Sequence, residues 1–508
     1  MHLFGIETEY GITREDLDAV DPVEESMELV RAHLTGGFER RWDYRGEDPH
    51  EDARGFRVSG LQQDKEEDDF AKVDAHRPYS FHEMKSDLVL PNGARFYNDH
   101  THPEYSTPEC RTLKDLLAHD RAGERIVQRA ADRRNQRLGG AHVQLYKNNT
   151  DFHGHSYGCH DNYLVPRELP FPQLVQGLLP FLVSRQLFAG AGKVGMEAQE
   201  SGFVPGLFQL SQRADFMEAE LGVDTMHNRP ILNTRDEPHA DRAKYRRLHL
   251  ILGDANMCEY ATALKVGTTR LVLDALQRGV SSQIELEQPV TAIKQLSRDP
   301  DLKTTVRLKD GRTMSGLAIQ EECWKAANRA CGGSDSDADW VLREWRETLQ
   351  RLAEDRTQLV GKLDWVTKQW LLETFMREEQ LAWEDPWLAS LDLEYHNLNP
   401  DRGLFLGLEA EGKTWRMTTE RDIAQALAAG PSDTRGGLRG LCVRRFPEQI
   451  TGMQWERVQF AGGLRNRTLE MGDLFDPEAV QTCAGLFETA ASPADALAAW
   501  ASKLRAHS

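Results

Sequence analysis

Two glutamates, Glu7 and Glu9, stand two positions apart in the segment GIETEYG at residues 5–11. In an extended strand such positions share one face, so both carboxylates would project side by side. The two carboxylates repel each other unless a cation neutralises them. Hard oxygen ligands of this kind suit Mg²⁺, above all where substrate phosphates share the metal. A solvated acidic strand face explains the same pattern and is the more common case. The pair by itself therefore identifies no function.

The segment RFYNDHTHPEYSTPE, at residues 95–109, places carboxylates, imidazoles, hydroxyls and an arginine in one run with few aliphatic side chains. It lies between an expected strand and an expected helix, a position where functional loops are often built. Asp99 is a candidate base or nucleophile, Glu104 a candidate metal ligand and Arg95 a candidate phosphate clamp. Taken alone, the run is explained equally well as a polar connection without function.

Residues 147–163, KNNTDFHGHSYGCHDNY, combine glycines, which let a backbone approach a ligand closely, with three histidines. The histidine spacing matches no zinc pattern, and we expect His153 and His155 to be solvated loop residues. His160 and Asn162 offer polar groups two positions apart. This segment is therefore a candidate ligand-binding loop.

A fourth polar segment, residues 233–249, contains Arg235 and several further basic side chains. Arginines can hold a carboxylate or a phosphate in bidentate geometry, or form a surface salt-bridge cluster. Together the four segments indicate a metal–nucleotide site with arginines for an anionic substrate. The sequence has neither GxxxxGK[ST] nor a convincing GxGxxG motif, so a nucleotide would not bind through a P-loop.

The elements expected around these segments would position them. Residues 2–12 alternate acidic and largely apolar side chains, as a half-buried strand does. Residues 88–98 show a second strand pattern, and Thr112 is suited to cap a helix that continues to about residue 137. Two further strands are expected at 141–147 and 245–252.

The rest of the chain predicts an α+β fold in which antiparallel strands and helices come in blocks. Helices are expected at 22–35, 173–188, 262–278, 317–331, 337–355 and 362–380. A hairpin should turn at Asp310 and Gly311. Residues 41–85 are charged and poor in aliphatic side chains, which predicts a long mobile insertion. We expect a catalytic domain at 1–428 and a small C-terminal domain at 429–508.

The 508-residue chain has a net charge of −19, which argues against broad nucleic-acid binding because such binding needs a basic surface. No run approaches the roughly 20 apolar residues of a membrane span, and the first residues do not resemble a signal peptide. The seven cysteines include no CxxC pair. A reduced cytoplasmic protein with buried thiols is the expectation.

Six motifs resemble the Pup ligase and Pup deamidase family, which acts on Pup, a small ubiquitin-like protein of actinobacteria and some other bacteria. The motifs are GIETEYG at 5–11, NGARFYNDHTHPEYSTPEC at 92–110, QLYKNNTDFHGHSYGCHDNYL at 144–164, PFLVSRQLFAGAGKVG at 180–195, LSQRAD at 210–215 and NTRDEPHADRAKYRRLHLILGDANMCE at 233–259. The resemblance covers nearly the whole chain. It implies a glutamine synthetase-like fold: a curved antiparallel sheet that cradles nucleotide and metals, packed helices and a small C-terminal domain.

The resemblance favours the deamidase branch of the family over the ligase branch. Deamidases carry an extra loop before the catalytic aspartate, and residues 41–85 lie at that place with the motifs RWDY at 41–44 and DARGF at 52–56. The DHTHPEY run also lacks the extra residue that ligases tend to carry after the aspartate. The acidic stretch at 63–69 departs from the family loop, but it lies outside these two motifs.

The resemblance implies a role for each matching position. Asp99 matches the catalytic aspartate. Magnesium-site positions are matched by Glu7, Tyr97 and Glu104, with Glu9 as a further ligand. Nucleotide-site positions are matched by Arg95, Thr107 and Trp455, and His160 resembles the histidine of the related synthetase loop. Positions that would hold phosphate or the C-terminal residue of Pup are matched by Arg213, Arg235 and His249.

The implied reaction is hydrolysis of a side-chain amide. The substrate is the C-terminal glutamine of Pup, which becomes glutamate, or the isopeptide bond between Pup and a substrate lysine. The implied cofactors are ATP, or ADP plus phosphate, and Mg²⁺. Pup and pupylated proteins are the implied partners, and the proteasomal system is a further candidate. Whether Asp99 or phosphate is the nucleophile stays open.

Three alternatives also stay open: a Pup–protein ligase, a non-catalytic Pup-binding adaptor, and a small-molecule carboxylate–amine ligase. Pup is itself acidic, so its binding to this acidic chain would need a local basic groove. The candidate groove residues are Lys244, Arg246, Arg247, Arg435, Arg439, Arg444 and Arg445, although scattered surface arginines explain each of them equally well.

Overall fold

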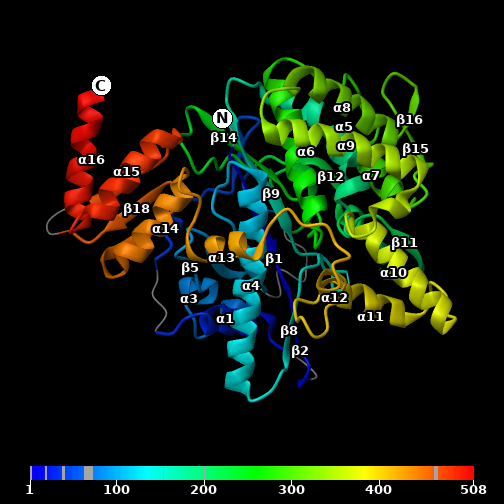
Figure 1. The fold of residues 1–508 in the computed structure, drawn as a ribbon, viewed down its shortest axis with the longest axis horizontal. Coiled ribbons are helices and arrows are strands. Elements are labelled where there is room, and N and C mark those ends of the chain that lie inside the picture. The colour runs from blue at the N-terminus through cyan, green and yellow to red at the C-terminus, as the bar shows by residue number, and fades with distance from the viewer. Residues whose placement is uncertain are drawn as a thin grey trace.

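The computed structural model describes residues 3–17, 20–36, 41–61, 72–152, 154–198, 202–462 and 467–507. The acidic stretch at 63–69 and His153 lie outside these residues. The predicted mixture of antiparallel strands and blocks of helices is confirmed (Figure 1).

Six antiparallel strands form the central sheet. In spatial order they are β14 (Tyr245–Leu250), β9 (Cys159–Pro166), β1 (Phe4–Glu9), β7 (His102–Ser106), β6 (Arg95–Asp99) and β5 (Leu88–Val89). The strand predicted over residues 2–12 is divided, because β2 (Gly11–Arg14) leaves this sheet and pairs with β8 (Val143–Tyr146). All polar segments singled out above therefore border one sheet, with β1 near its middle.

The two faces of the sheet differ, as the alternation of acidic and apolar side chains along β1 predicts. Phe4 and Ile6 are buried, whereas Glu7 and Glu9 are half-buried. The apolar face is covered by α4 (Leu113–Leu138), which contacts β1 and β7, and by α1 (Pro22–Ala32), which contacts β6 and β7. Thr112 caps α4 as predicted, since its side chain accepts a hydrogen bond from the backbone N–H of the residue at N3. The opposite face is left to the polar side chains.

A block of helices continues the same hydrophobic core beyond the sheet (Figure 1). α6 (Glu259–Gln277) is buried along almost its whole length and packs against α5 (Phe171–Ala189), α8 (Gly316–Cys331) and α9 (Ser336–Glu354). The other helices of this part are α7 (Pro289–Ser297), α10 (Asp364–Glu379), α11 (Pro386–Tyr395), α12 (Leu404–Ala410) and α13 (Glu420–Ala428). The predicted hairpin is confirmed as β15 (Thr305–Arg307) and β16 (Thr313–Ser315).

Several short elements were not predicted. They are the antiparallel pair β10 (Lys193–Ala198) and β11 (Gly202–Gln209), the parallel pair β12 (Ala219–Gly222) and β13 (Pro230–Asn233), and the 3₁₀ turns η2 (Ala214–Phe216), η3 (Arg356–Leu359) and η4 (Pro447–Gln449).

The insertion at 41–85 carries more local structure than its composition predicts. It contains η1 (Tyr44–Gly46), the hairpin of β3 (Glu51–Asp52) and β4 (Phe56–Arg57), and α3 (Phe81–Lys85). Its first motif is tied to the C-terminal part of the chain, because Asp43 N donates to Met453 O at 2.9 Å. Its second motif is tied to the segment after β13, because Ala53 N donates to Thr234 O at 2.8 Å. Both motifs are thus anchored to distant segments.

The C-terminal elements are α14 (Arg435–Arg445), β17 (Ile450–Met453), β18 (Arg457–Phe460), β19 (Arg467–Glu470), α15 (Pro477–Thr489) and α16 (Pro493–His507). They enclose a second hydrophobic cluster and form the orange and red part of Figure 1. All seven cysteines of the chain are buried and unpaired, as expected. Among the described residues, no helix is long and apolar enough to cross a membrane.

Candidate active site

The strand register assembles the polar face of the sheet. Glu7 lies opposite His160 on β9, and Glu9 lies opposite Glu104 on β7. Glu104 in turn lies opposite Tyr97 on β6. Directly opposed residues have Cβ atoms about 5 Å apart, so the register alone brings the first three polar segments into contact.

Three carboxylates, from Glu9, Asp99 and Glu104, form an acidic group at one end of this face. One oxygen of each lies within 4.8 Å of the others. The hydroxyls of Tyr97 and Ser106 donate to Glu104 Oε1 at 2.7 and 3.1 Å. Burial, reinforced by the neighbouring carboxylates, raises the pKa of Glu104 well above its ordinary value. A cation would relieve this repulsion, and oxygen donors of this kind suit Mg²⁺.

The carboxylate of Asp99 is held by two basic groups. Lys85, the last residue of α3, places Nζ 2.5 Å from Asp99 Oδ1. His100 Nδ1 lies 3.4 Å from the same oxygen. Burial acts to raise the pKa of Asp99, but Lys85 and His100 outweigh it and lower this pKa well below its ordinary value. Asp99 is therefore ionised at neutral pH, the form that a base or a nucleophile requires.

Glu7, His160 and His249 form a second group, the histidine group, with ligand atoms within 4.8 Å of one another. His160 Nδ1 lies 3.3 Å from Glu7 Oε2, and Arg247 Nη1 lies 3.5 Å from Glu7 Oε1. Burial acts to raise the pKa of Glu7, but His160 and Arg247 lower it overall. Burial and Arg247 also lower the pKa of His249 well below its ordinary value, so its imidazole is neutral and able to bind a metal.

Arg95, the first residue of β6, lies between aromatic rings on the polar face of the sheet. Its guanidinium carbon is 3.7 Å from the ring centre of Tyr97 and 4.1 Å from that of Trp42. Nε donates to Asp87 Oδ1 at 2.8 Å, and Nη2 donates to the Tyr44 hydroxyl at 2.7 Å. Within the described part of the chain, Nη1 makes no hydrogen bond. Because Trp42 and Tyr44 belong to the first motif of the insertion, the insertion helps to build this site.

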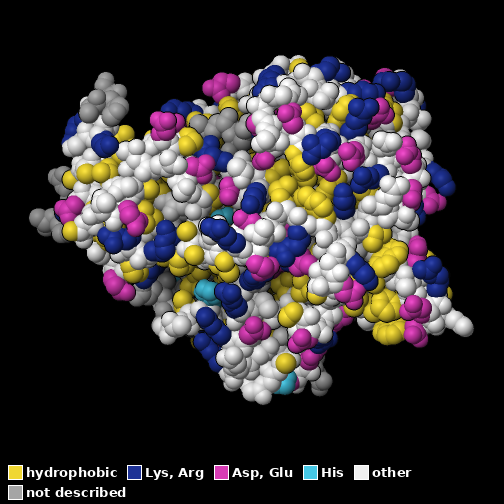
Figure 2. Space-filling view, viewed as in Figure 1, with side chains coloured by type: hydrophobic (Ala, Val, Ile, Leu, Met, Phe, Trp, Pro, Cys, Tyr) yellow, Lys and Arg dark blue, Asp and Glu magenta, His cyan; other side chains and the backbone are white. Residues whose placement is uncertain are grey.

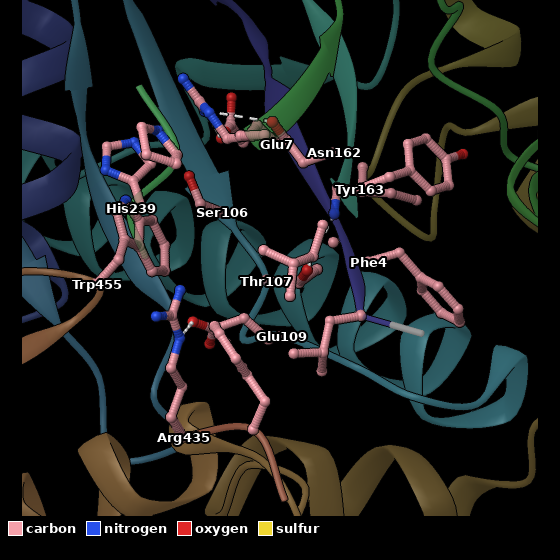
Figure 3. A pocket seen from close by; sticks show the side chains of 17 residues that line it. Phe4, Glu7, Ser106, Thr107, Glu109, Asn162, Tyr163, His239, Arg435 and Trp455 are labelled. Atoms are coloured by element: carbon pink, nitrogen blue, oxygen red, sulfur yellow. Dashed lines mark hydrogen bonds and ion pairs between the residues drawn. The ribbon is translucent and has the colours of Figure 1, made fainter. Parts of the chain in front are cut away.

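A cavity of about 90 Å³ opens at the Gly5 end of β1 (Figure 3). Thr107, Trp455, His239 and Arg435 are among the residues that line it. Thr107 Oγ1 accepts a hydrogen bond from Ile6 N at 3.1 Å, and the indole of Trp455 forms a flat wall beside His239. Aromatic walls with a few charged groups suit a purine base.

Arg213 and Arg235 lie to the side of these groups. Arg213 is fully buried and donates to Tyr157 O and Ile251 O, each at 2.8 Å. Burial lowers its pKa to about 10. Arg235 is half-buried and donates from Nε to Val223 O at 2.7 Å. Neither guanidinium is hydrogen-bonded to the acidic or histidine group within the described ranges, and their roles toward phosphate or Pup stay predictions.

Sequence reasoning missed Lys85 and Asp87, which pair with Asp99 and Arg95. The strand pattern does not signal the first pair, because Lys85 ends α3 and β5 begins only at Leu88.

The predicted basic groove is wrong for Arg435 and Arg439, which the fold buries. Arg435 and Arg439 are buried and pair with Glu109 at 2.7 and 2.8 Å, and Lys244 pairs with Asp473. Arg444 and Arg445 donate to backbone carbonyls. Lys244, Arg444 and Arg445 are exposed, so their part in a groove stays a prediction. On the face drawn in Figure 2, basic and acidic side chains are interspersed and form no basic stripe.

A family model described as Pup-ligase protein matches residues 2–459. A depupylase of Acidothermus cellulolyticus is 44% identical over 474 residues, which are 91% of this chain and 91% of that protein. A Pup deamidase/depupylase of Mycolicibacterium smegmatis is 43% identical and covers 90% of this chain and 91% of its own length. A Pup–protein ligase of Acidimicrobium ferrooxidans is 45% identical but covers 72% of this chain and 81% of its own.

Two solved structures share the fold. The complex between Pup and its ligase PafA aligns with a TM-score of 0.76 at 34% identity, over 97% of this chain and 94% of that chain. The Pup ligase PafA in complex with ADP aligns with a TM-score of 0.73 at 35% identity, over 86% and 98%. Together with the family match over most of its length, these likenesses show that the chain belongs to the Pup ligase family, alongside depupylases and Pup ligases.

Proposed function

We propose that this protein is a Pup deamidase and depupylase. It hydrolyses the C-terminal glutamine amide of Pup to glutamate and cleaves the isopeptide bond between Pup and substrate lysines. One observation carries the choice: the sequence match to depupylases extends over about nine-tenths of both chains, whereas the sequence match to the ligase of Acidimicrobium ferrooxidans covers 72% of this one. The insertion at 41–85, with both motifs anchored, is the feature expected of the deamidase branch.

The cavity of Figure 3 is the proposed nucleotide site, for ATP or for ADP plus phosphate. Trp455 and Thr107 would contact the nucleoside at the Gly5 end of β1. A strand rises about 3.3 Å per residue, so Glu7 and Glu9 follow within the length of a nucleotide. The phosphates would then lie between the acidic and histidine groups, within reach of Arg95. The relative PafA has been solved with ADP, which supports this assignment.

Divalent cations fit the oxygen donors of both groups, and we assign Mg²⁺ to Glu7, Glu9 and Glu104. The acidic group offers the carboxylates of Glu9 and Glu104 beside the catalytic candidate Asp99, and burial together with the neighbouring carboxylates raises the pKa of Glu104. The histidine group offers the ionised Glu7, while His160 and His249 keep the nucleotide and Pup roles that the resemblance implies. Tyr97 donates its hydroxyl proton to Glu104, so we give it the role of orienting that ligand. When bound, Mg²⁺ would polarise the amide carbonyl and neutralise phosphate charge.

The protein's own residues then perform the hydrolysis. Ionised Asp99 either attacks the amide carbon or orients and deprotonates the group that attacks it. As the C–N bond breaks, its electron pair stays on nitrogen, which takes up a proton and leaves as ammonia or as a lysine amine. Water balances the reaction: its oxygen and one hydrogen become the hydroxyl of the new acid, and its other hydrogen replaces the proton that the nitrogen takes up. If Asp99 attacks directly, the same water breaks the anhydride bond between Asp99 and Pup and restores the carboxylate. Arg95 and Arg247 bring positive charge to the face where the oxyanion develops.

Further proposals concern the fold, the C-terminal domain, the location and the partners of the protein. The central sheet would correspond to a glutamine synthetase-like sheet, and residues 429–508 to a small C-terminal domain, which the second hydrophobic cluster supports. A cytoplasmic location agrees with the seven unpaired, buried cysteines. Pup and pupylated proteins are the partners, and the proteasomal system is a further candidate.

One incubation tests the function: the protein, ATP, Mg²⁺ and Pup ending in glutamine, followed by mass spectrometry. We expect the terminal amide to become an acid, and a pupylated protein to release free Pup. Inertness toward glutamine-ended Pup, with conjugation of glutamate-ended Pup to lysine, would assign the protein to the ligases. Nucleotide binding without turnover of any Pup substrate would make it an adaptor.

A further inference from the structure

An ammonium group of the protein itself lies against the candidate catalytic carboxylate. Lys85 Nζ is 2.5 Å from Asp99 Oδ1 and 5.9 Å from the ring centre of Tyr97. The side chains of Lys85 and Asp99 are 17% and 25% exposed, so the contact lies at the accessible edge of the site. A carboxylate beside an aromatic ring is a combination that binds a primary ammonium.

Isopeptide cleavage releases the same chemical group, the ε-amine of a lysine. If Asp99 attacks the amide carbon, the attacking oxygen and the leaving nitrogen become bonded to the same carbon atom. If Asp99 instead deprotonates the attacking group, it carries the proton that the leaving nitrogen must take up, and it can pass this proton on only within hydrogen-bond reach of that nitrogen. Both mechanisms place the leaving amine next to Asp99, where Lys85 Nζ lies in this structure.

We propose, resting on the proposed function, that Lys85 occupies the leaving-amine subsite and competes there with the ε-amine of a substrate lysine. Depupylation then requires the Lys85 side chain to withdraw from Asp99. Deamidation releases only ammonia and needs less room in the same place. Lys85 is therefore a specificity-determining residue that favours free, glutamine-ended Pup over Pup conjugates.

The backbone around Lys85 is held in place, so the competition concerns the side chain. A capping box formed by Ser80 and Glu83 begins α3. Arg31 of α1 donates to Glu83 O at 2.9 Å and to Ser86 Oγ at 3.1 Å, which fixes the end of the helix. A lysine stem has four rotatable carbons, and it can swing the ammonium into solvent without a change in α3.

The test is the ratio of depupylation to deamidation. We expect Lys85→Ala to raise this ratio about two- to fivefold, the range set by a partly exposed ion pair, and Lys85→Arg to keep the parental ratio. An unchanged ratio, or an equal fall in both rates, would overturn the proposal, because Lys85 would then only position Asp99. Lys309→Ala is the matched control, since Lys309 forms an exposed ion pair with Glu285 at 3.0 Å.

A small amine gives a second, independent readout. n-Butylamine should inhibit Lys85→Ala at lower concentration than the parent, because the vacated subsite is open to a primary ammonium. Equal inhibition of both proteins would overturn the proposal. Thermal unfolding confirms that each variant is folded. Failure of the proposed function looks different, because the parent protein itself would then neither deamidate nor depupylate.

Discussion

Glu104 and Glu109 stand five residues apart, one in β7 and one just after it, and their carboxylates have opposite surroundings. Glu109 meets Arg435 and Arg439 of α14 at 2.7 and 2.8 Å. Burial acts to raise the pKa of Glu109, but the two arginines outweigh it and lower the pKa to about 2. Glu104 meets other carboxylates, and its pKa is raised well above the ordinary value.

The difference separates a structural carboxylate from a functional one. For Glu109 the chain supplies the opposite charges itself, and the ion pairs join α14 to the segment after β7. For Glu104 the nearest partners are the hydroxyls of Tyr97 and Ser106, which donate hydrogen bonds but carry no charge. A buried carboxylate among like charges indicates that the neutralising cation comes from outside the chain.

The largest effect is expected at Asp99, the ionised member of the acidic group. Asp99→Asn keeps the shape of the side chain and removes its charge. Deamidation and depupylation should both fall about a thousandfold or more, as for a residue that takes part in the reaction. The thermal unfolding temperature should fall only slightly, because the lost ion pair with Lys85 is offset by weaker repulsion on Glu104. Substantial residual activity in a discontinuous mass assay would remove Asp99 from the chemistry.

The acidic end of the site could be predicted because its signals are local. The alternation of Glu7 and Glu9 within a few residues predicts one strand face, and the polar run around Asp99 predicts a second contributor. Pairing the two required only that neighbouring strands share a face. The family resemblance then gave Asp99 and Glu104 their separate roles.

The partners of Glu109 could not be predicted in the same way. Arg435 and Arg439 lie more than 300 residues away in the chain, and no local pattern distinguishes a buried arginine from a surface one. They were expected to line a groove for Pup, whereas the fold buries both against Glu109. The anchors of the insertion were not predicted for the same reason, because its composition does not reveal the backbone bonds to Met453 and Thr234.

The second prediction concerns Glu104 and tests the external cation directly. Mg²⁺ should raise the thermal stability of the parent, by about 2.7 kcal/mol when its concentration is 100 times Kd. Glu104→Gln should lose most of this gain and most activity. Without Mg²⁺ the variant should be at least as stable as the parent, because a repelled carboxylate is gone. An equal gain in both proteins would show that Glu104 does not hold the cation. Glu478→Gln, in the first turn of α15, is the control.

The third prediction concerns Glu109, for which we expect the opposite of the behaviour of Glu104. Its pKa falls from 4.5 to about 2 on folding, which corresponds to about 3 kcal/mol of stability at neutral pH. Because the folded pKa is the lower one, this stability is complete above about pH 4.5 and is lost as the pH falls towards 2. In urea unfolding, Glu109→Gln should be less stable than the parent by about this amount at pH 7. This difference in stability between parent and variant should become smaller at pH 3. Mg²⁺ should stabilise parent and variant equally. A gap independent of pH would mean that the ion pairs contribute nothing.

The smallest effect is expected at Trp455, which connects the structural carboxylate to the proposed nucleotide site. Arg439 Nη1 donates to Trp455 O at 2.9 Å, and the guanidinium lies 4.7 Å from the indole centre. Trp455→Ala removes the aromatic wall and should weaken ADP binding about three- to tenfold by calorimetry. Trp387→Ala, at an exposed position of α11, should leave ADP binding unchanged. Unaltered ADP affinity would exclude the cavity of Figure 3 as the nucleotide site. If Glu109 affects that site only by holding Arg439 against the indole, adding Glu109→Gln to Trp455→Ala should weaken ADP binding no further.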